Sequence, residues 1–204
     1  MSGYYLYEPS MANVGTYDLF SIPKQCVGDN DFVEIVNRVF EYQDDNNAKT
    51  NKDVIFFDQI PYNNDTIFND IEQEVVNILN NYLDKNYCVK LHPRTSPDAK
   101  VYEGVEKMMT KQTFELLCLN EPLLTEKVLI TPFSTSVALP KTLYDKEPIV
   151  ISLVKLFESR FKASNLIIGF FEKLKSTYRD GSRVYLPQTL DEFSKIIKDI
   201  KKEL

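Results

Sequence analysis

The chain is poor in several residue types that mark familiar kinds of site. It has no tryptophan, one histidine, three cysteines and six glycines among 204 residues. The cysteines Cys26, Cys88 and Cys118 show no paired spacing, so with a single histidine they argue against a structural zinc site and for a reducing compartment. No glycine-rich phosphate loop follows the first apolar strand, which weighs against a flavodoxin-like domain for another phosphate-bearing ligand.

Long apolar stretches and basic runs are also missing. The longest uncharged run, 128–140, is interrupted by Pro132 and four hydroxyl residues, and the N-terminus has no basic region. Neither a transmembrane span nor a signal peptide is therefore expected. A net charge of −6 excludes strong sequence-independent binding to nucleic acid. We expect a soluble, cytoplasmic protein that binds no nucleic acid.

What the chain does contain is a regular alternation of apolar runs with helical patterns. Its 43% hydrophobic and 26% charged residues are typical of a folded globular protein with one good core. The alternation predicts an α/β fold, namely a Rossmann-like, mainly parallel sheet of four or five strands with helices on both faces. Residues 4–7 form a short strand or an extended arm, and 43–53 form a polar linker or an exposed loop.

The expected elements follow from these patterns. The expected strands are 54–58, 87–91, 114–119, 128–130, 148–151 and 183–186. The expected helices are 31–42, 66–84, a short one near 101–109, one ending near Tyr144, 160–175 and a last one that opens with the capping box of Thr189 and Glu192.

The single histidine, His92, follows an apolar strand and precedes a proline. Pro93 disfavours the helical region for His92 and holds it extended at the start of a polar loop. Lys90 and Arg94 place two positive charges beside an imidazole whose ordinary pKa is about 6.5. A lone histidine is more often a surface or core residue than a site residue, so its role depends on what lies near it.

Three hydroxyl residues, Ser134, Thr135 and Ser136, follow another strand where a helix begins. One of them could simply cap the helix. Because ligands bind at the carboxyl ends of parallel strands, these hydroxyls and His92 could also converge on one phosphate. Glu115, the second residue of the expected strand 114–119, is either a surface glutamate or a carboxylate that accepts from two ribose hydroxyls.

The order of three motifs resembles that of bacterial sialyltransferases. The motifs are Lys-Leu-His-Pro at 90–93, Phe-Glu-Leu-Leu at 114–117 and Ser-Thr-Ser at 134–136 followed by Ala-Leu-Pro. The chain is most similar to glycosyltransferase family 52, whose members make lipooligosaccharide and capsule and have the two-domain GT-B architecture. The resemblance covers nearly the whole chain and corresponds to the C-terminal, nucleotide-binding half of these enzymes. It implies that residues 51–204 form the CMP-sugar-binding domain. Residues 1–50 would then be an arm and a helix that lead from an N-terminal domain.

The resemblance implies a role for each motif. His92 would contact the phosphate of CMP-sialic acid and stabilise the departing CMP, and Ser134, Thr135 and Ser136 would hold the same phosphate, with the choice of two among the three left open. Glu115 would bind the ribose hydroxyls, while Pro93 and the backbone after His92 would read the cytosine. No metal and no cofactor are implied; the nearest acidic pair, Asp29 and Asp31, is typical of a helix cap.

The resemblance also identifies a part that the chain lacks. Family members take their general base from an aspartate of the N-terminal domain, and the only Asp-Gly here, Asp180-Gly181, is typical of a turn. Two functions stay open: a metal-independent, inverting sialyltransferase acting on a glycan acceptor, completed by another domain or chain, and a CMP-sugar-binding module with little or no turnover. Both functions are compatible with a homo-oligomer. Both are also compatible with attachment of the lysine-rich last helix to the inner membrane surface, although the acidic residues of that helix favour an ordinary solvated helix.

Overall fold

The computed structural model describes residues 3–12, 16–24, 28–44, 49–59, 66–110, 112–160 and 164–203. Its main sheet has the strands β3 (Val54–Phe57), β4 (Cys88–Lys90), β5 (Glu106–Met108), β6 (Val128–Thr131), β7 (Ile149–Ser152) and β8 (Val184–Tyr185). All neighbours pair in parallel, in the order β5-β4-β3-β6-β7-β8. This is the strand order of the Rossmann fold, so the expected class is confirmed, and the described sheet has six strands rather than four or five.

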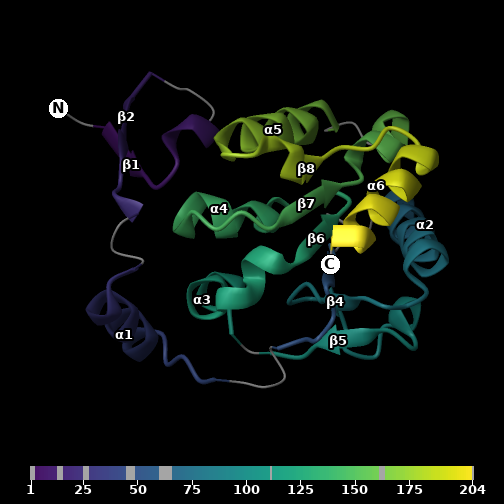
Figure 1. The fold of residues 1–204 in the computed structure, drawn as a ribbon, viewed down its shortest axis with the longest axis horizontal. Coiled ribbons are helices and arrows are strands. Elements are labelled where there is room, and N and C mark those ends of the chain that lie inside the picture. The colour runs from purple at the N-terminus through teal and green to yellow at the C-terminus, as the bar shows by residue number, and fades with distance from the viewer. Residues whose placement is uncertain are drawn as a thin grey trace.

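Helices cover both faces of this sheet (Figure 1). One face carries α2 (Thr66–Leu83) and α6 (Leu190–Glu203), and the other carries α3 (Phe114–Asn120), α4 (Leu139–Tyr144) and α5 (Ser164–Thr177). Side chains of β3 alternate between the two cores, with Val54 and Phe56 on the α2 side and Ile55 and Phe57 on the α3 side. Because both faces are covered, the central strands are continuous apolar runs, and such runs were the ones the sequence predicted best.

Residues 114–119 form a helix, so the expected strand there is wrong. Thr113 caps α3 by accepting a hydrogen bond from the backbone N–H of Leu116, and Glu115 lies in the first turn, where its charge suits the helix dipole. Five of the seven residues of α3 are buried. A short helix that is apolar on nearly all sides has no visible 3.6-residue period, so its sequence cannot be told from that of a buried strand.

The short helix expected near 101–109 is also wrong. The segment instead forms a 3-10 turn, η5 (Lys100–Tyr102), followed by the edge strand β5. This strand has no apolar signature, since two of its three residues are charged. Other 3-10 segments among the described residues are η1 (Pro9–Met11), η6 (Pro122–Glu126), η7 (Thr135–Ala138), η8 (Val154–Arg160) and η9 (Gly181–Arg183).

The N-terminal segment lies outside the main sheet (Figure 1). Its strands β1 (Gly3–Leu6) and β2 (Asp18–Ser21) pair in parallel with each other, which gives the expected strand near residue 4 a partner that the sequence did not indicate. Helix α1 (Asn30–Val39) confirms the helix expected at 31–42, and Asp29 caps it as expected. The proposed division at residues 50 and 51 stays a prediction, and 45–48 and 60–65 lie outside the described residues.

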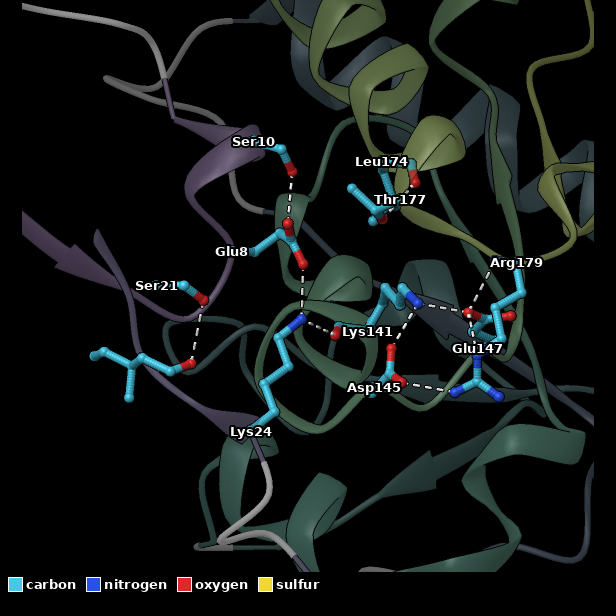
Figure 2. A network of polar contacts seen from close by, with 11 residues as sticks. Glu8, Ser10, Ser21, Lys24, Lys141, Asp145, Glu147, Leu174, Thr177 and Arg179 are labelled. Atoms are coloured by element: carbon cyan, nitrogen blue, oxygen red, sulfur yellow. Dashed lines mark hydrogen bonds and ion pairs between the residues drawn. The ribbon is translucent and has the colours of Figure 1, made fainter. Parts of the chain in front are cut away.

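Polar contacts hold this segment against the helices of the main domain. The Lys24 ammonium donates to Glu8 at 2.7 Å and to the carbonyl of Lys141 in α4 at 3.2 Å (Figure 2). The side-chain amides of Asn37 and Asn120 exchange two hydrogen bonds of 2.8 and 2.9 Å between α1 and α3. No residue of β1, β2 or α1 is buried, but Met11 and Tyr42 are partly buried against the core on the α3 side, so both polar and apolar contacts position the segment.

The last helix packs against the sheet. Phe193, Ile197 and Ile200 of α6 are buried in the core beside α2. Thr189 accepts a hydrogen bond from the N–H of Glu192, as the capping box predicts, whereas the Glu192 carboxylate accepts from the N–H of Gln188. Among the described helices, none has the length and apolar character needed to cross a bilayer.

Candidate functional site

A cleft of about 650 Å³ opens at the carboxyl ends of β3, β4 and β6. This is the edge where an open parallel sheet binds its ligands, beside the point where the strand order reverses. The residues expected at the site that line this cleft are His92, Pro93, Glu115, Ser134 and Ser136. Thr135 is exposed and is not among the lining residues, so of the three hydroxyl residues the geometry brings the two serines to the cleft.

His92 is held in place by its backbone as well as by its ring. Its N–H donates to Asp58 Oδ2 at 3.0 Å. Its Nδ1 accepts the backbone N–H of Arg94 at 3.2 Å. Because Nδ1 is an acceptor, the neutral ring carries its proton on Nε2, which makes Nε2 a hydrogen-bond donor.

Asp58, which directly follows β3, was not predicted as a site residue. It is 4% exposed and lines the cleft. Its carboxylate accepts hydrogen bonds from the His92 N–H, the Thr95 hydroxyl and the Tyr102 hydroxyl, the last at 2.8 Å. Burial alone would raise the pKa of Asp58, but its contacts with Glu72 and these donors hold that pKa below the ordinary value. Asp58 therefore stays ionised and anchors the loop that carries His92.

Behind Asp58, two carboxyl groups share one phenol. The Tyr102 hydroxyl lies 2.8 Å from Asp58 Oδ1 and 2.7 Å from Glu72 Oε1. A phenol has one proton, so it can donate to one carboxylate only, and the other contact requires a protonated carboxyl. Burial, assisted by the neighbouring Asp58, raises the pKa of Glu72 to about 8, so Glu72 is the protonated partner at neutral pH.

The hydroxyls at the end of β6 combine capping with free donors. Ser134 Oγ accepts the N–H of Ser136 at 3.3 Å, and the Ser134 N–H donates to Thr131 Oγ1 at 2.8 Å. The capping function considered from the sequence is therefore present. Within the described residues, neither serine hydroxyl has an acceptor for its own proton, so both can donate to a ligand in the cleft.

Lys90 brings a positive charge into the same cleft. Its ammonium lies 5.8 Å from the centre of the Phe57 ring and 5.6 Å from that of Phe114. Burial lowers the pKa of Lys90, and the opposing effect of the nearby carboxylates, Glu115 foremost, is smaller. The sequence indicated a charge beside His92, but nothing in it showed that the side chain reaches the cleft.

Glu115 is the exposed carboxylate at the rim. It projects from the first turn of α3 and lines the cleft, so its predicted position at the site is reached from a helix rather than a strand. Within the described ranges, no three side chains of histidine, cysteine, aspartate or glutamate gather as metal ligands would. Cys88 and Cys118 are buried and unpaired.

One family model matches the chain. The model describes alpha-2,8-polysialyltransferase (POLYST) and matches residues 6–138, a range that includes Asp58, Lys90, His92, Glu115 and the 134–136 hydroxyls. The sialyltransferase character expected from the three motifs is thereby confirmed, whereas the narrower assignment to glycosyltransferase family 52 stays a prediction. No curated protein matches the chain.

Proposed function

Because the chain belongs to the alpha-2,8-polysialyltransferase family, we propose that its cleft binds CMP-sialic acid as the donor of a sialyl group for a glycan acceptor. The observation that carries this proposal is the convergence of the His92 imidazole with the Ser134 and Ser136 hydroxyls on one cleft at the carboxyl edge of a Rossmann-type sheet. Within the part of the chain that the structure describes, the Nε2–H group and the two hydroxyls have no acceptor, so they can donate to a phosphate.

His92 is the residue proposed to act on the leaving group. As the bond between the sugar and the phosphate breaks, negative charge accumulates on CMP. A fixed donor, His92 Nε2–H, stabilises that charge without reorganising, because the backbone contacts of His92 hold the ring in place. The two serine hydroxyls hold the same phosphate and set its position relative to the imidazole.

The remaining cleft residues are proposed to hold the nucleoside. Glu115 accepts from the ribose hydroxyls, since a carboxylate can accept from two neighbouring hydroxyls. Pro93 and the backbone that follows His92 contact the cytosine. The assignment to family 52, the correspondence to the C-terminal half of a GT-B enzyme and a role in surface polysaccharide or lipooligosaccharide synthesis belong to this proposal, as does the absence of a metal or cofactor requirement.

A second candidate is a CMP-sugar-binding module with little or no transferase activity. The observation in its favour is that the buried carboxylate of the cleft, Asp58, already accepts three hydrogen bonds and is therefore a poor base. A general base typically contributes about 10²–10⁴-fold to a rate. Release of CMP from CMP-sialic acid in the presence of a glycan acceptor favours the transferase; binding of the donor without release favours the module.

Calorimetry with nucleotides tests the shared part of both candidates. The wild type should bind CMP in preference to UMP and GMP, and His92→Ala should weaken CMP binding roughly 10- to 100-fold, the usual effect of a hydrogen bond to a charged group. Ser182→Ala is the control, since Ser182 is an exposed residue of η9 away from the cleft. Equal affinity for the three nucleotides, or unchanged CMP affinity in His92→Ala, would contradict the proposal.

A further inference from the structure

Lys90 differs from the other lysines that the structure places in partly or fully buried positions. Lys141 pairs with Asp145 at 2.6 Å and with Glu147 at 2.5 Å. Lys146 donates to the carbonyls of Leu119 and Glu121 at the end of α3. Within the described residues, the Lys90 ammonium has two aromatic rings and no hydrogen-bond acceptor or ion-pair partner. Its charge is therefore the least compensated of these lysines.

An uncompensated ammonium in such a position has a physical cost. Removing a charged group from water is unfavourable unless a partner of opposite charge or a set of acceptors replaces the lost hydration. The faces of Phe57 and Phe114 supply only part of that compensation. An anion in the cleft would supply the rest, and it would be bound more strongly there than in bulk water because the surroundings are partly desolvated.

The position of Lys90 agrees with such an anion. Lys90 pairs in register with Phe57 on β3, and its side chain lines the cleft on which His92, Ser134 and Ser136 also converge. The two serines and the histidine offer hydrogen bonds from neutral groups, whereas Lys90 offers a full charge. Its carboxylate neighbours, Glu115 and Asp58, act on it only at distances beyond an ion pair.

We propose that Lys90 is the cation that binds the anionic part of the ligand in this cleft, pairing directly with a phosphate or a carboxylate group. The inference rests on the proposed function, since CMP-sialic acid carries both groups: the phosphate of the nucleotide and the carboxylate of the sugar. The charge of Lys90 would then determine the affinity of the cleft for its ligand. Among the residues that the structure describes, no carboxylate lies within ion-pair distance of Lys90, which leaves its ammonium available for the ligand.

The test compares wild type, Lys90→Met and Lys90→Arg in calorimetry with cytidine, CMP and CMP-sialic acid. Lys90→Met removes the charge but keeps a long apolar side chain, so it should fold. If Lys90 binds the phosphate, Lys90→Met loses roughly 10- to 100-fold in CMP affinity and none in cytidine affinity, and Lys90→Arg recovers part of the loss. If it binds the sugar carboxylate, CMP affinity stays unchanged and only the affinity for CMP-sialic acid falls.

Lys155→Met provides the matched control, because Lys155 is also partly buried but pairs with Glu172 at 3.2 Å outside the cleft. It should leave all three affinities unchanged. Equal losses for cytidine and CMP in Lys90→Met would assign Lys90 a structural role and overturn the inference. So would unchanged affinities for all three ligands.

A second measurement separates this inference from the proposed function. The NMR signals of the Lys90 side chain, assigned with Lys90→Arg, report on its ammonium during titration with CMP and with inorganic phosphate. If neither CMP nor CMP-sialic acid binds the wild type but inorganic phosphate shifts these signals, the proposed function is wrong and the anion site stands. If neither phosphate nor the CMP compounds shift them, the anion site is wrong.

Discussion

Two regions of the molecule differ in how they compensate the charge of a lysine, one buried (Lys141) and one half-buried (Lys90). Beside α4, Lys141 is the centre of an ion-pair cluster, which we define as Lys141, Asp145, Glu147 and Arg179 (Figure 2). Lys141 is 4% exposed and also lies 5.7 Å from the centre of the Tyr178 ring. At the cleft, Lys90 has similar aromatic neighbours but no carboxylate within ion-pair distance among the described residues.

The difference indicates that the charge of Lys141 stabilises the fold and that the charge of Lys90 is available to bind a ligand. Two carboxylates compensate Lys141, and Lys24 joins its carbonyl to the N-terminal segment, so this region holds parts of the chain together. The Lys90 ammonium lies to one side of two neighbouring rings, in a cleft with free hydroxyl donors, and within the described residues its charge has no such function in the fold. Replacement of each lysine should therefore affect a different property.

The largest expected effect is loss of stability in Lys141→Met. The substitution leaves Asp145 and Glu147 close together with only the exposed Arg179 to compensate them. Removing one partner of a buried ion pair costs roughly 3 kcal/mol in free energy of unfolding. Urea unfolding at neutral pH measures it, and a loss below about 0.5 kcal/mol would contradict the structural role of the cluster.

The two regions should also respond to pH in opposite directions. In the ion-pair cluster, ion pairing outweighs burial and lowers the pKa of Asp145 and Glu147, so their stabilisation is present above their ordinary pKa values and is lost as the pH falls. Beneath the cleft, the pKa of Glu72 is raised from 4.5 to about 8. Its contribution is complete below pH 4.5 and is lost as the pH rises to about 8, because over this range the unfolded state has released the proton that the folded state still holds.

Glu72→Gln tests the second of these slopes. Between pH 5 and pH 8, the free energy of unfolding of the wild type should fall by roughly 2 kcal/mol relative to the variant, which has no proton to lose. This is about half of what the full pKa shift would give, because Glu72 is only partly buried. Urea unfolding at several pH values measures the difference. Parallel plots of unfolding free energy against pH for the two proteins would contradict the assignment of a proton to Glu72 at neutral pH.

The smallest expected effect is on the stability of Lys90→Met. Because the substitution removes an uncompensated charge and keeps the packing against Phe57 and Phe114, it should leave the free energy of unfolding unchanged or raise it by up to about 1 kcal/mol. Urea unfolding without ligand provides the measurement. A loss comparable to that of Lys141→Met would show that Lys90 supports the fold after all.

The sequence predicted the central strands and the long amphipathic helices well, because these elements depend on local patterns. Strands β3, β6 and β7 are continuous apolar runs, and α2 and α6 have a clear apolar face, so each could be recognised on its own. The sequence failed at α3, which is buried on nearly all sides, and at β5, which is short and charged. In both cases the surrounding structure decides the element.

The candidate site was predictable in part for the same reason. His92 and Ser134 each follow an apolar strand, and strand ends mark the binding edge of a parallel sheet. Asp58 also follows a strand, but its role depends on His92, Thr95 and Tyr102, which lie 34 to 44 residues further along the chain. That Lys90 has no carboxylate partner among the described residues is likewise a property of the folded neighbourhood, which no local pattern expresses.

One measurement addresses the central claim that the cleft is a CMP site whose charge comes from Lys90. The urea midpoint is recorded with and without CMP-sialic acid for wild type, Lys141→Met and Lys90→Met. A ligand at about 100 times its Kd stabilises the folded state by about 2.7 kcal/mol. CMP-sialic acid should therefore raise the midpoint of the wild type and of the weakened Lys141→Met, and raise that of Lys90→Met much less. No shift in the wild type, or an equal shift in Lys90→Met, would contradict the claim.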